Sequence, residues 1–461
     1  MCKADEKTKS TEPDREWYYL GVYLTLALVC CADQVFSMLM AFYPAVVEDK
    51  GLSPTLTGVL FGSFAFFSVV ANIFATTLTK KYGSSRTLTI STFVLALSVL
   101  AYAFTDMVEE LNLYFTVCFL LRTVQGLTSG CIEVAALGIL MRSVPQEKAG
   151  DTVGWLESAR ALGMIGGPLV GSSIYSSFGY SGPFLFSAML VGGIGVVMVT
   201  TGFSSNKSNE STSTGTSTTM RIVKLPVIGA CLCTMLLCSA AITFFEPTLE
   251  PFLNRDPYKL SDVHVAIIYT TAIISFGVGA GVSGDITSRL GNVPTLTYSL
   301  LVTALGFFIA APPETFTGPL SIFAFLYAEK YVIHQMILAL FLIGGGVGIS
   351  VAPYSKILID EAANIGLSVD ASSDAISSIT AIAFSVGAAI GPFSSGILVD
   401  NMGFRKSCSL FGYVCGIAGI IILYYIGGVV AKQKLTQTDE KNETGQLLDN
   451  ANEKTYDSIL V

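Results

Sequence analysis

Charge is scarce in this chain of 461 residues. Asp, Glu, Lys and Arg make up 13% of it, against roughly 25% in ordinary soluble domains. The hydrophobic fraction is 52% and the mean hydropathy is +0.63. A chain this long and this poor in charge is typical of a polytopic membrane protein. The net charge of −8 comes mostly from loops and tails, and no basic stripe with aromatic residues indicates nucleic-acid binding.

The residues that catalysis needs are also few. Histidine occurs twice, as His264 and His334, and no Ser/His/Asp arrangement or metal-ligand cluster is present. No Gly-x-x-x-x-Gly-Lys-Ser/Thr motif indicates ATP hydrolysis. The chain is therefore predicted not to be an enzyme, to need no cofactor, and to draw energy from a gradient. Most of the ten cysteines lie in apolar runs, where they are expected to pack as small hydrophobic residues.

Long apolar runs are what the sequence has in abundance. Residues 1–17 form a polar tail without the apolar core of a cleavable signal peptide. Twelve runs follow, each near or above the ~20 residues that a helix needs to cross the hydrocarbon. They are 18–46, 55–79, 87–105, 112–141, 152–176, 182–203, 222–249, 263–286, 293–311, 336–359, 372–399 and 408–431.

The distribution of Lys and Arg predicts which side each loop faces. Most of these residues lie in the two tails and in the loops that follow the second, fourth, sixth, eighth and tenth runs. Because cytosolic loops carry an excess of Lys and Arg, these loops and both termini are expected in the cytosol. A Ser/Thr/Asn-rich linker, Ser204 to Met220, separates two six-helix halves. The predicted organisation is a cytosolic tail (1–17), a first half (18–203), a linker (204–221), a second half (222–431) and a disordered cytosolic tail (432–461).

An internal repeat supports the two halves. A glycine- and proline-rich stretch lies in the fifth run and again in the eleventh, and glycine allows close approach of helices in lipid. A turn with a glycine and basic residues also follows both the second and the eighth run. The distance in sequence from the glycine turn to the glycine- and proline-rich stretch is longer in the second half than in the first. Pro312 to His334 is therefore interpreted as an enlarged outer loop. The packing and gating residues are Gly163, Gly167, Pro168, Gly171, Gly387, Gly391 and Pro392, and the loop residues are Gly83, Arg86, Asp285, Arg289 and Gly291.

Ionisable residues inside the runs are candidates for function, because a charge in the hydrocarbon costs a few kcal/mol. Glu246 stands beside Pro247 with no base within a helical turn, which favours a substrate or proton site. Glu157 could bind substrate, or it and Arg160, three residues away, could simply neutralise each other as a structural pair. Arg122 could form a structural pair with Asp33 or Glu133. Aromatic faces for an organic cation could come from Phe64, Phe66, Phe67, Phe244 and Phe245, or these could serve only in helix packing.

The repeated glycine turns and the Gly163–Gly171 stretch resemble the major facilitator superfamily and its proton-coupled antiporters. The resemblance implies an all-α fold of twelve transmembrane helices in two pseudo-repeats. The loop motif is degraded, since Thr77 stands where the second copy has Asp285.

From about Tyr18 to Gly428, the chain is similar to the vesicular amine transporter family. Phe119 to Gly126 resembles that family's fourth helix, and Phe244 to Leu249 resembles its seventh. Gly154 to Phe184 and a short first outer loop resemble its polyamine-transporting branch most. The likeness implies that Asp33 binds amine, although it is displaced by one position relative to Pro44. Val351 and Ala381 occupy the places of two aspartates of the monoamine carriers, so proton coupling through those acids is excluded.

The sequence thus predicts a monomeric carrier whose halves rock about a central site and exchange an organic cation, polyamine or monoamine, for protons. A carrier of another solute with this fold, or a receptor or scaffold that transports nothing, remains an alternative. The tail contains two patterns similar to clathrin-adaptor signals in vesicular carriers, which predicts residence in secretory, synaptic or endolysosomal vesicles. Their anchoring residues are Glu443, Leu447, Leu448, Tyr456 and Ile459.

Overall fold

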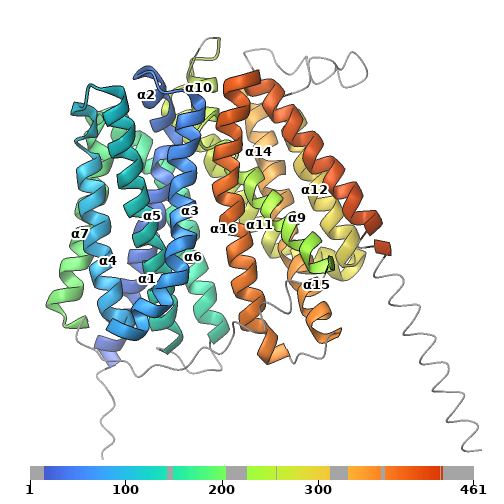
Figure 1. Ribbon diagram of the computed structural model, residues 1–461, viewed down its shortest axis with the longest axis horizontal. Helices are drawn as coiled ribbons and strands as arrows, with labels where there is room; N and C mark the ends of the chain where they lie inside the picture. Colours follow the sequence, from blue (N-terminus) through green and yellow to red (C-terminus); the bar gives the residue numbers. More distant parts are fainter. Residues whose placement is uncertain are drawn as a thin grey trace, which may run out of the picture.

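The computed structural model describes residues 15–142, 149–203, 226–255, 257–311, 331–364, 369–425 and 427–428. Within these ranges the regular structure is entirely helical. The helices form two bundles side by side, one from each half of the chain (Figure 1). The linker 204–221 and the tail after residue 432 lie outside the described ranges, as does most of the predicted outer loop.

The first bundle contains six long helices and three short elements. The first long helix and the fifth, α1 and α6, are neighbours in space, although three other long helices lie between them in the chain. The elements are α1 (Arg15–Ser37), η1 (Met38–Ala41), α2 (Tyr43–Asp49), α3 (Pro54–Tyr82), α4 (Ser84–Tyr102), η2 (Thr105–Met107), α5 (Leu111–Arg142), α6 (Ala149–Phe178) and α7 (Ser181–Thr200).

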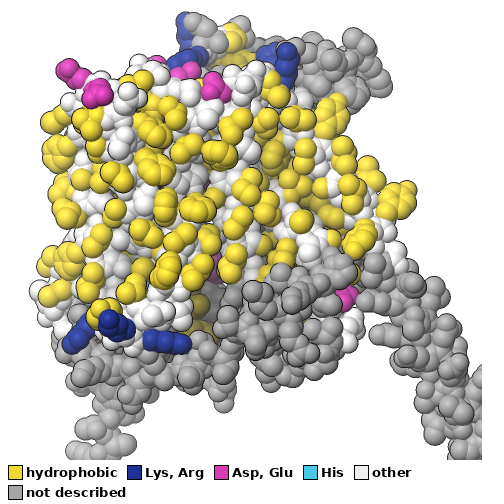
Figure 2. All heavy atoms as spheres, in the orientation of Figure 1, with side chains coloured by type: hydrophobic (Ala, Val, Ile, Leu, Met, Phe, Trp, Pro, Cys, Tyr) yellow, Lys and Arg dark blue, Asp and Glu magenta, His cyan; other side chains and the backbone are white. Residues whose placement is uncertain are grey.

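The second bundle repeats this arrangement. Its elements are α9 (Pro226–Thr243), α10 (Leu249–Asn254), α11 (Asp262–Leu290), α12 (Asn292–Ala310), α14 (Val332–Ile349), α15 (Val351–Asn364), α16 (Val369–Met402) and a last helix, Phe404–Tyr425. Among the described residues, ten spans are long and apolar enough to cross a membrane, and α6 and the shorter α9 complete the predicted twelve. A belt of exposed hydrophobic side chains separates two ends that carry charged residues (Figure 2), as expected for a chain surrounded by lipid.

Three of the predicted runs are not single helices. The first is interrupted by η1 before Pro44, the seventh by the turn 244–248 that contains Pro247, and the tenth at Ser350. Proline has no backbone N–H and cannot complete the hydrogen-bond ladder of a helix. Hydropathy did not reveal these breaks because the residues around them are themselves apolar.

Glycine ends matching helices in the two bundles. Gly83 ends α3 with φ +87°, and Gly291 ends α11 with φ +88°. Gly179 and Gly403, after α6 and α16, have φ of +70° and +79°. Side chains disfavour this left-handed region, so glycine allows the chain to reverse at each of these four points. The structure thus confirms the sequence repeat at the level of backbone conformation.

The two bundles contact each other through α3 with α16 and through α6 with α11. At the first contact a Cβ on Gly58 would overlap the carbonyl oxygen of Pro392, and one on Gly396 would overlap that of Pro54. The backbones are therefore as close as backbones can come, near the end of the molecule that carries α2 and α10 (Figure 1). We call this end the α2–α10 end.

Candidate functional site

Glu246 lies at the break between α9 and α10, where the seventh predicted run was expected to continue as a helix. The residue is 3% exposed. The turn around it is held by Tyr269 of α11, whose hydroxyl donates to the carbonyl oxygen of Phe245 at 2.5 Å. A carboxylate on an irregular segment deep in the bundle is the arrangement that carriers use to bind ions and substrates near the membrane midplane.

Arg122 of α5 is the cation that faces Glu246 from the other half of the chain. It is 1% exposed, and the two side chains are near enough to interact electrostatically. Its Nη1 donates to Gln125 Oε1 at 3.2 Å, while Nη2 has no hydrogen-bond partner among the described residues. The guanidinium carbon lies 4.7 Å from the centroid of the Phe64 ring. Arg122 was expected to pair with Asp33 or Glu133; none of the ion pairs in the described part of the chain includes it.

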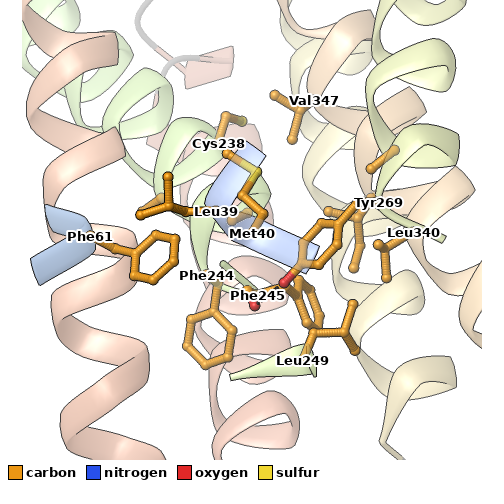
Figure 3. Packing of buried hydrophobic residues seen from close by; sticks show 14 of the residues in the cluster. Leu39, Met40, Phe61, Cys238, Phe244, Phe245, Leu249, Tyr269, Leu340 and Val347 are labelled. Carbon is orange, nitrogen blue, oxygen red and sulfur yellow. Dashed lines mark hydrogen bonds between the residues drawn. The ribbon is translucent and has the colours of Figure 1, made fainter. Parts of the chain in front are cut away.

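The aromatic candidates divide into two groups. Phe244 and Phe245 are fully buried and pack against Phe307 and Phe411 of their own half. Figure 3 shows them in one cluster with Tyr269 and Leu249, together with Leu39 and Met40 from the first half. They therefore serve in helix packing. Phe64 faces the Arg122 guanidinium. Phe66 is exposed, and the partly buried Phe67 contacts both Phe66 and Phe119 of α5.

A second group of charges lies within the first bundle. Arg160 Nη2 is 2.5 Å from Glu133 Oε1, and its Nε is 3.9 Å from Glu157 Oε1. Asp33 of α1 also interacts electrostatically with Arg160. Asn72 donates to the other Glu133 oxygen at 3.4 Å. One base thus faces three acids, and its short contact is with Glu133 rather than with Glu157.

The glycine repeats hold helices together inside each half. A Cβ on Gly163 would overlap the carbonyl of Cys30, and one on Gly167 would overlap Ser37 Oγ, both on α1. Gly171 faces Met38 of η1 in the same way. In the second half, Gly387 and Gly391 contact Leu236 and Thr243 of α9. The expected packing role is therefore located at α1–α6 and α9–α16, and both α6 and α16 remain helical through Pro168 and Pro392.

The residues of the two loop motifs, which are predicted to be cytosolic, lie at the ends of α3 and α11. Lys80, Lys81 and Arg86 flank the turn at Gly83, and Asp285 and Arg289 precede the turn at Gly291. Arg86, Asp285 and Arg289 are exposed. The predicted sorting residues in the tail lie outside the described residues.

Sequence reasoning missed the residues that close the α2–α10 end. Glu48, Glu250 and Arg255 connect α2 to the α10 segment, and Gly58 and Gly396 join α3 to α16. Contacts between positions so far apart in the chain leave no trace in the periodicity of a single sequence. Glu250 directly follows the last residue of the seventh predicted run, so it was not among the ionisable residues considered inside the runs.

Known proteins resemble this chain in sequence. MFS-type transporter SLC18B1 of Rattus norvegicus is 26% identical over 403 residues, which cover 85% of this chain and 83% of the relative. The chromaffin granule amine transporter of Rattus norvegicus is 26% identical over 358 residues, covering 77% of this chain and 63% of the relative. The expected similarity to vesicular amine transporters is confirmed.

Solved structures agree on the fold. A bacterial homolog of the human lysosomal transporter Spinster, in an inward-facing and unoccupied conformation, matches with a TM-score of 0.68 at 13% identity, over 89% of this chain and 97% of that one. Residues 25–371 match the family profile described as Major Facilitator Superfamily. The chain is a multi-pass membrane transporter rather than an enzyme, and it belongs to the Major Facilitator Superfamily.

Proposed function

We propose that the chain exchanges an organic cation, a polyamine or a monoamine, for protons and so accumulates the cation in an intracellular vesicle. The observation that carries the proposal is Glu246, a buried acid on a helix break that faces Arg122 of the other half. An acid between two rocking halves is placed to hold either a cation or a proton. The similarity to the chromaffin granule amine transporter supports an amine as the cation.

The acids of the first half support a substrate with more than one positive charge. Asp33, Glu133 and Glu157 surround the single base Arg160, so this group carries excess negative charge. Together with Glu246, it gives each half of the chain carboxylates within its predicted spans. A linear polyamine carries several ammonium groups and would use acids of both halves, whereas a monoamine would occupy one site.

The proposal also covers the orientation of the chain in the membrane of an intracellular vesicle. The basic turns at Gly83 and Gly291 lie in the expected cytosolic loops, and the α2–α10 end would then face the vesicle lumen. In this orientation the described contacts between the halves close the lumenal end. The chain would act as a monomer, since each copy contains both halves of the site.

Uptake by purified protein in liposomes with an acidic interior tests the proposal. Wild-type protein should accumulate radiolabelled spermidine, and Glu246→Gln should reduce accumulation at least tenfold because the amide cannot exchange a proton. Glu109→Gln, which changes an exposed acid near η2, is the matched control and should transport normally. Near wild-type spermidine uptake by Glu246→Gln would overturn the role of this acid.

The same assay separates the alternatives. Accumulation of an anionic or neutral solute in place of amines would identify a carrier with another substrate. Absence of gradient-driven uptake for every solute tried, with correctly folded protein, would favour a receptor or scaffold.

A further inference from the structure

The α2–α10 end is closed by polar contacts between short helices of opposite halves. The backbone N–H of Ala45 in α2 donates to Glu250 Oε2 in α10 at 2.5 Å. Arg255, directly after α10, places Nη1 2.6 Å from Glu48 Oε1 and Nη2 3.4 Å from Asp49 Oδ1. These contacts join Glu48, Asp49 and Ala45 of the first half to Glu250 and Arg255 of the second.

Glu250 is held in place by its own half as well. The residue is fully buried, and its other carboxyl oxygen accepts from Asn254 Nδ2 at 2.8 Å. The same amide donates to Asp262 Oδ1 of α11 at 3.1 Å. A buried carboxyl that spans two bodies can keep these contacts only while the bodies are together. When the halves separate at this end, Glu250 becomes exposed to the adjoining aqueous compartment.

We propose that Glu250 and Glu48 form a proton-operated latch, in which uptake of protons from the adjoining compartment favours closure of the α2–α10 end. The groups that face Glu250 explain why proton uptake should favour closure rather than opening. They are mainly acidic or neutral: Glu48 from α2, Asp262 and the phenol of Tyr269 from α11, and the phenol of Tyr175 from α6. Among the cations at this end, Arg255 contacts Glu48 and Asp49, and Lys50 contacts Asp106. Closure therefore buries an acid among other acids.

The pKa of Glu250 follows from this burial. Removal from water raises the pKa of its carboxyl from 4.5 to about 8, against the opposing effect of hydrogen bonds from Asn254 and Ala45. Burial also raises the pKa of Glu48, although Arg255 opposes it. When the halves separate and Glu250 is hydrated, its pKa returns toward 4.5. The closed form therefore binds the proton more tightly than the open form. Between those pH values, falling pH stabilises closure and rising pH favours opening.

A cavity adjoins this contact on the side of Glu48. A cavity of about 150 Å³ lies between the halves beside α2 and α10, and its lining includes Pro44, Glu48, Pro251 and Phe252. The space is sufficient for several water molecules. Identification of this end as the lumenal one depends on the proposed function, whereas proton-linked closure does not. In an acidic vesicle the latch would favour return of the empty carrier to the cytosol-open state.

Hydrogen–deuterium exchange of the full chain in lipid nanodiscs tests the latch without substrate or gradient. Peptides covering α2 and α10 are followed at pH 5.5 and 8.5, with labelling times corrected for the intrinsic pH dependence of amide exchange. The pKa difference corresponds to a closed-to-open ratio on the order of 100-fold larger at the lower pH. We expect corrected exchange in these peptides to be at least tenfold slower at pH 5.5.

Two variants make the test specific. Glu250→Gln keeps the shape but cannot titrate, so most of the pH difference should disappear. Asp106→Asn removes a carboxylate that pairs with Lys50 at 2.9 Å within the first half, and it should keep the wild-type difference. Equal protection of wild type at both pH values, or a full pH difference in Glu250→Gln, would overturn the latch. Neither outcome depends on uptake of any solute, so failure of the latch is separate from failure of the proposed transport.

Discussion

At the scale of single residues, the two arginines inside the membrane differ in their surroundings. Arg160 has a close carboxylate partner in Glu133, whereas Arg122 has an aromatic face and interacts electrostatically, without an ion-pair contact, with an acid on the other half. The first arrangement is suited to holding one half together. The second can change as the halves move, because its charges belong to different bodies.

Replacement of Arg160 tests the first arrangement. Arg160→Ala should lower stability by about 2 kcal/mol, since Glu133 then keeps a partly buried charge without its closest partner. The melting temperature of purified protein in detergent measures this loss. The double variant Arg160→Ala with Glu133→Gln should recover much of the stability, because no unpaired charge remains.

Glu157 is a different case within the same group. Its side chain is 61% exposed and lies 3.9 Å from Arg160 Nε, so the expected mutual neutralisation is weak. Glu157→Gln should therefore leave the melting temperature nearly unchanged while raising the apparent Michaelis constant for spermidine severalfold. Equal destabilisation by Glu157→Gln and Arg160→Ala would instead support a purely structural pair.

At the scale of elements, α6 packs closely against α1 because glycines on α6 have no side chains to hold the two helices apart. Gly163 and Gly167 allow the two backbones to touch, and the adjacent Gly166 has nothing within 4 Å of a Cβ position. Sequence analysis predicted that these glycines pack closely and take part in gating, but it could not name their partner helix. The structure shows that the close packing lies within one half, and the gating role stays a prediction.

Gly167→Leu should separate α6 from α1, because its side chain would collide with Ser37 Oγ and the carbonyl of Gln34. We expect normal amounts of membrane-inserted protein but fewer substrate molecules accumulated per proton released, as measured in liposomes. Gly166→Leu on the open face is the matched control and should couple normally. Unchanged stoichiometry in Gly167→Leu would show that tight α1–α6 packing is unnecessary for coupling.

At the scale of the whole molecule, the sequence predicted the twelve spans and their two repeated halves, and the structure confirms both. Hydropathy and repeats are local properties, so they are visible in one chain. The partner of Arg122, the breaks at η1 and Ser350, and the contacts of Glu250 depend on where distant segments meet. Asp33 and Glu246 could be singled out because a charge inside an apolar run is conspicuous by itself.

Sorting of the protein to vesicles is predicted to depend on its C-terminal tail. The triple variant Leu447→Ala, Leu448→Ala, Tyr456→Ala should move a fluorescently tagged protein from vesicles to the cell surface, because adaptor pockets would lose their anchoring side chains. Gln446→Ala with Asn452→Ala changes neighbouring residues and should leave the distribution as it is. Surface biotinylation measures the shift, and an unchanged vesicular fraction in the triple variant would assign the address to another segment.

The glycine contact between α3 and α16 has a mechanical consequence. At Gly58 and Gly396 backbone lies directly on backbone, so this point can serve as a pivot between the two helices, with the hydrogen bond from Thr55 Oγ1 to Asp400 Oδ2 beside it. From Gly58 to Tyr82, the lever arm of α3 is about 36 Å long at the helical rise per residue. A rotation of about 10° would then displace the far end of α3 by about 6 Å. The pivot at Gly58 lies near the α2–α10 end of the molecule. A small opening of the latch at that end would therefore produce a much larger movement of the helix ends on the opposite side of the membrane.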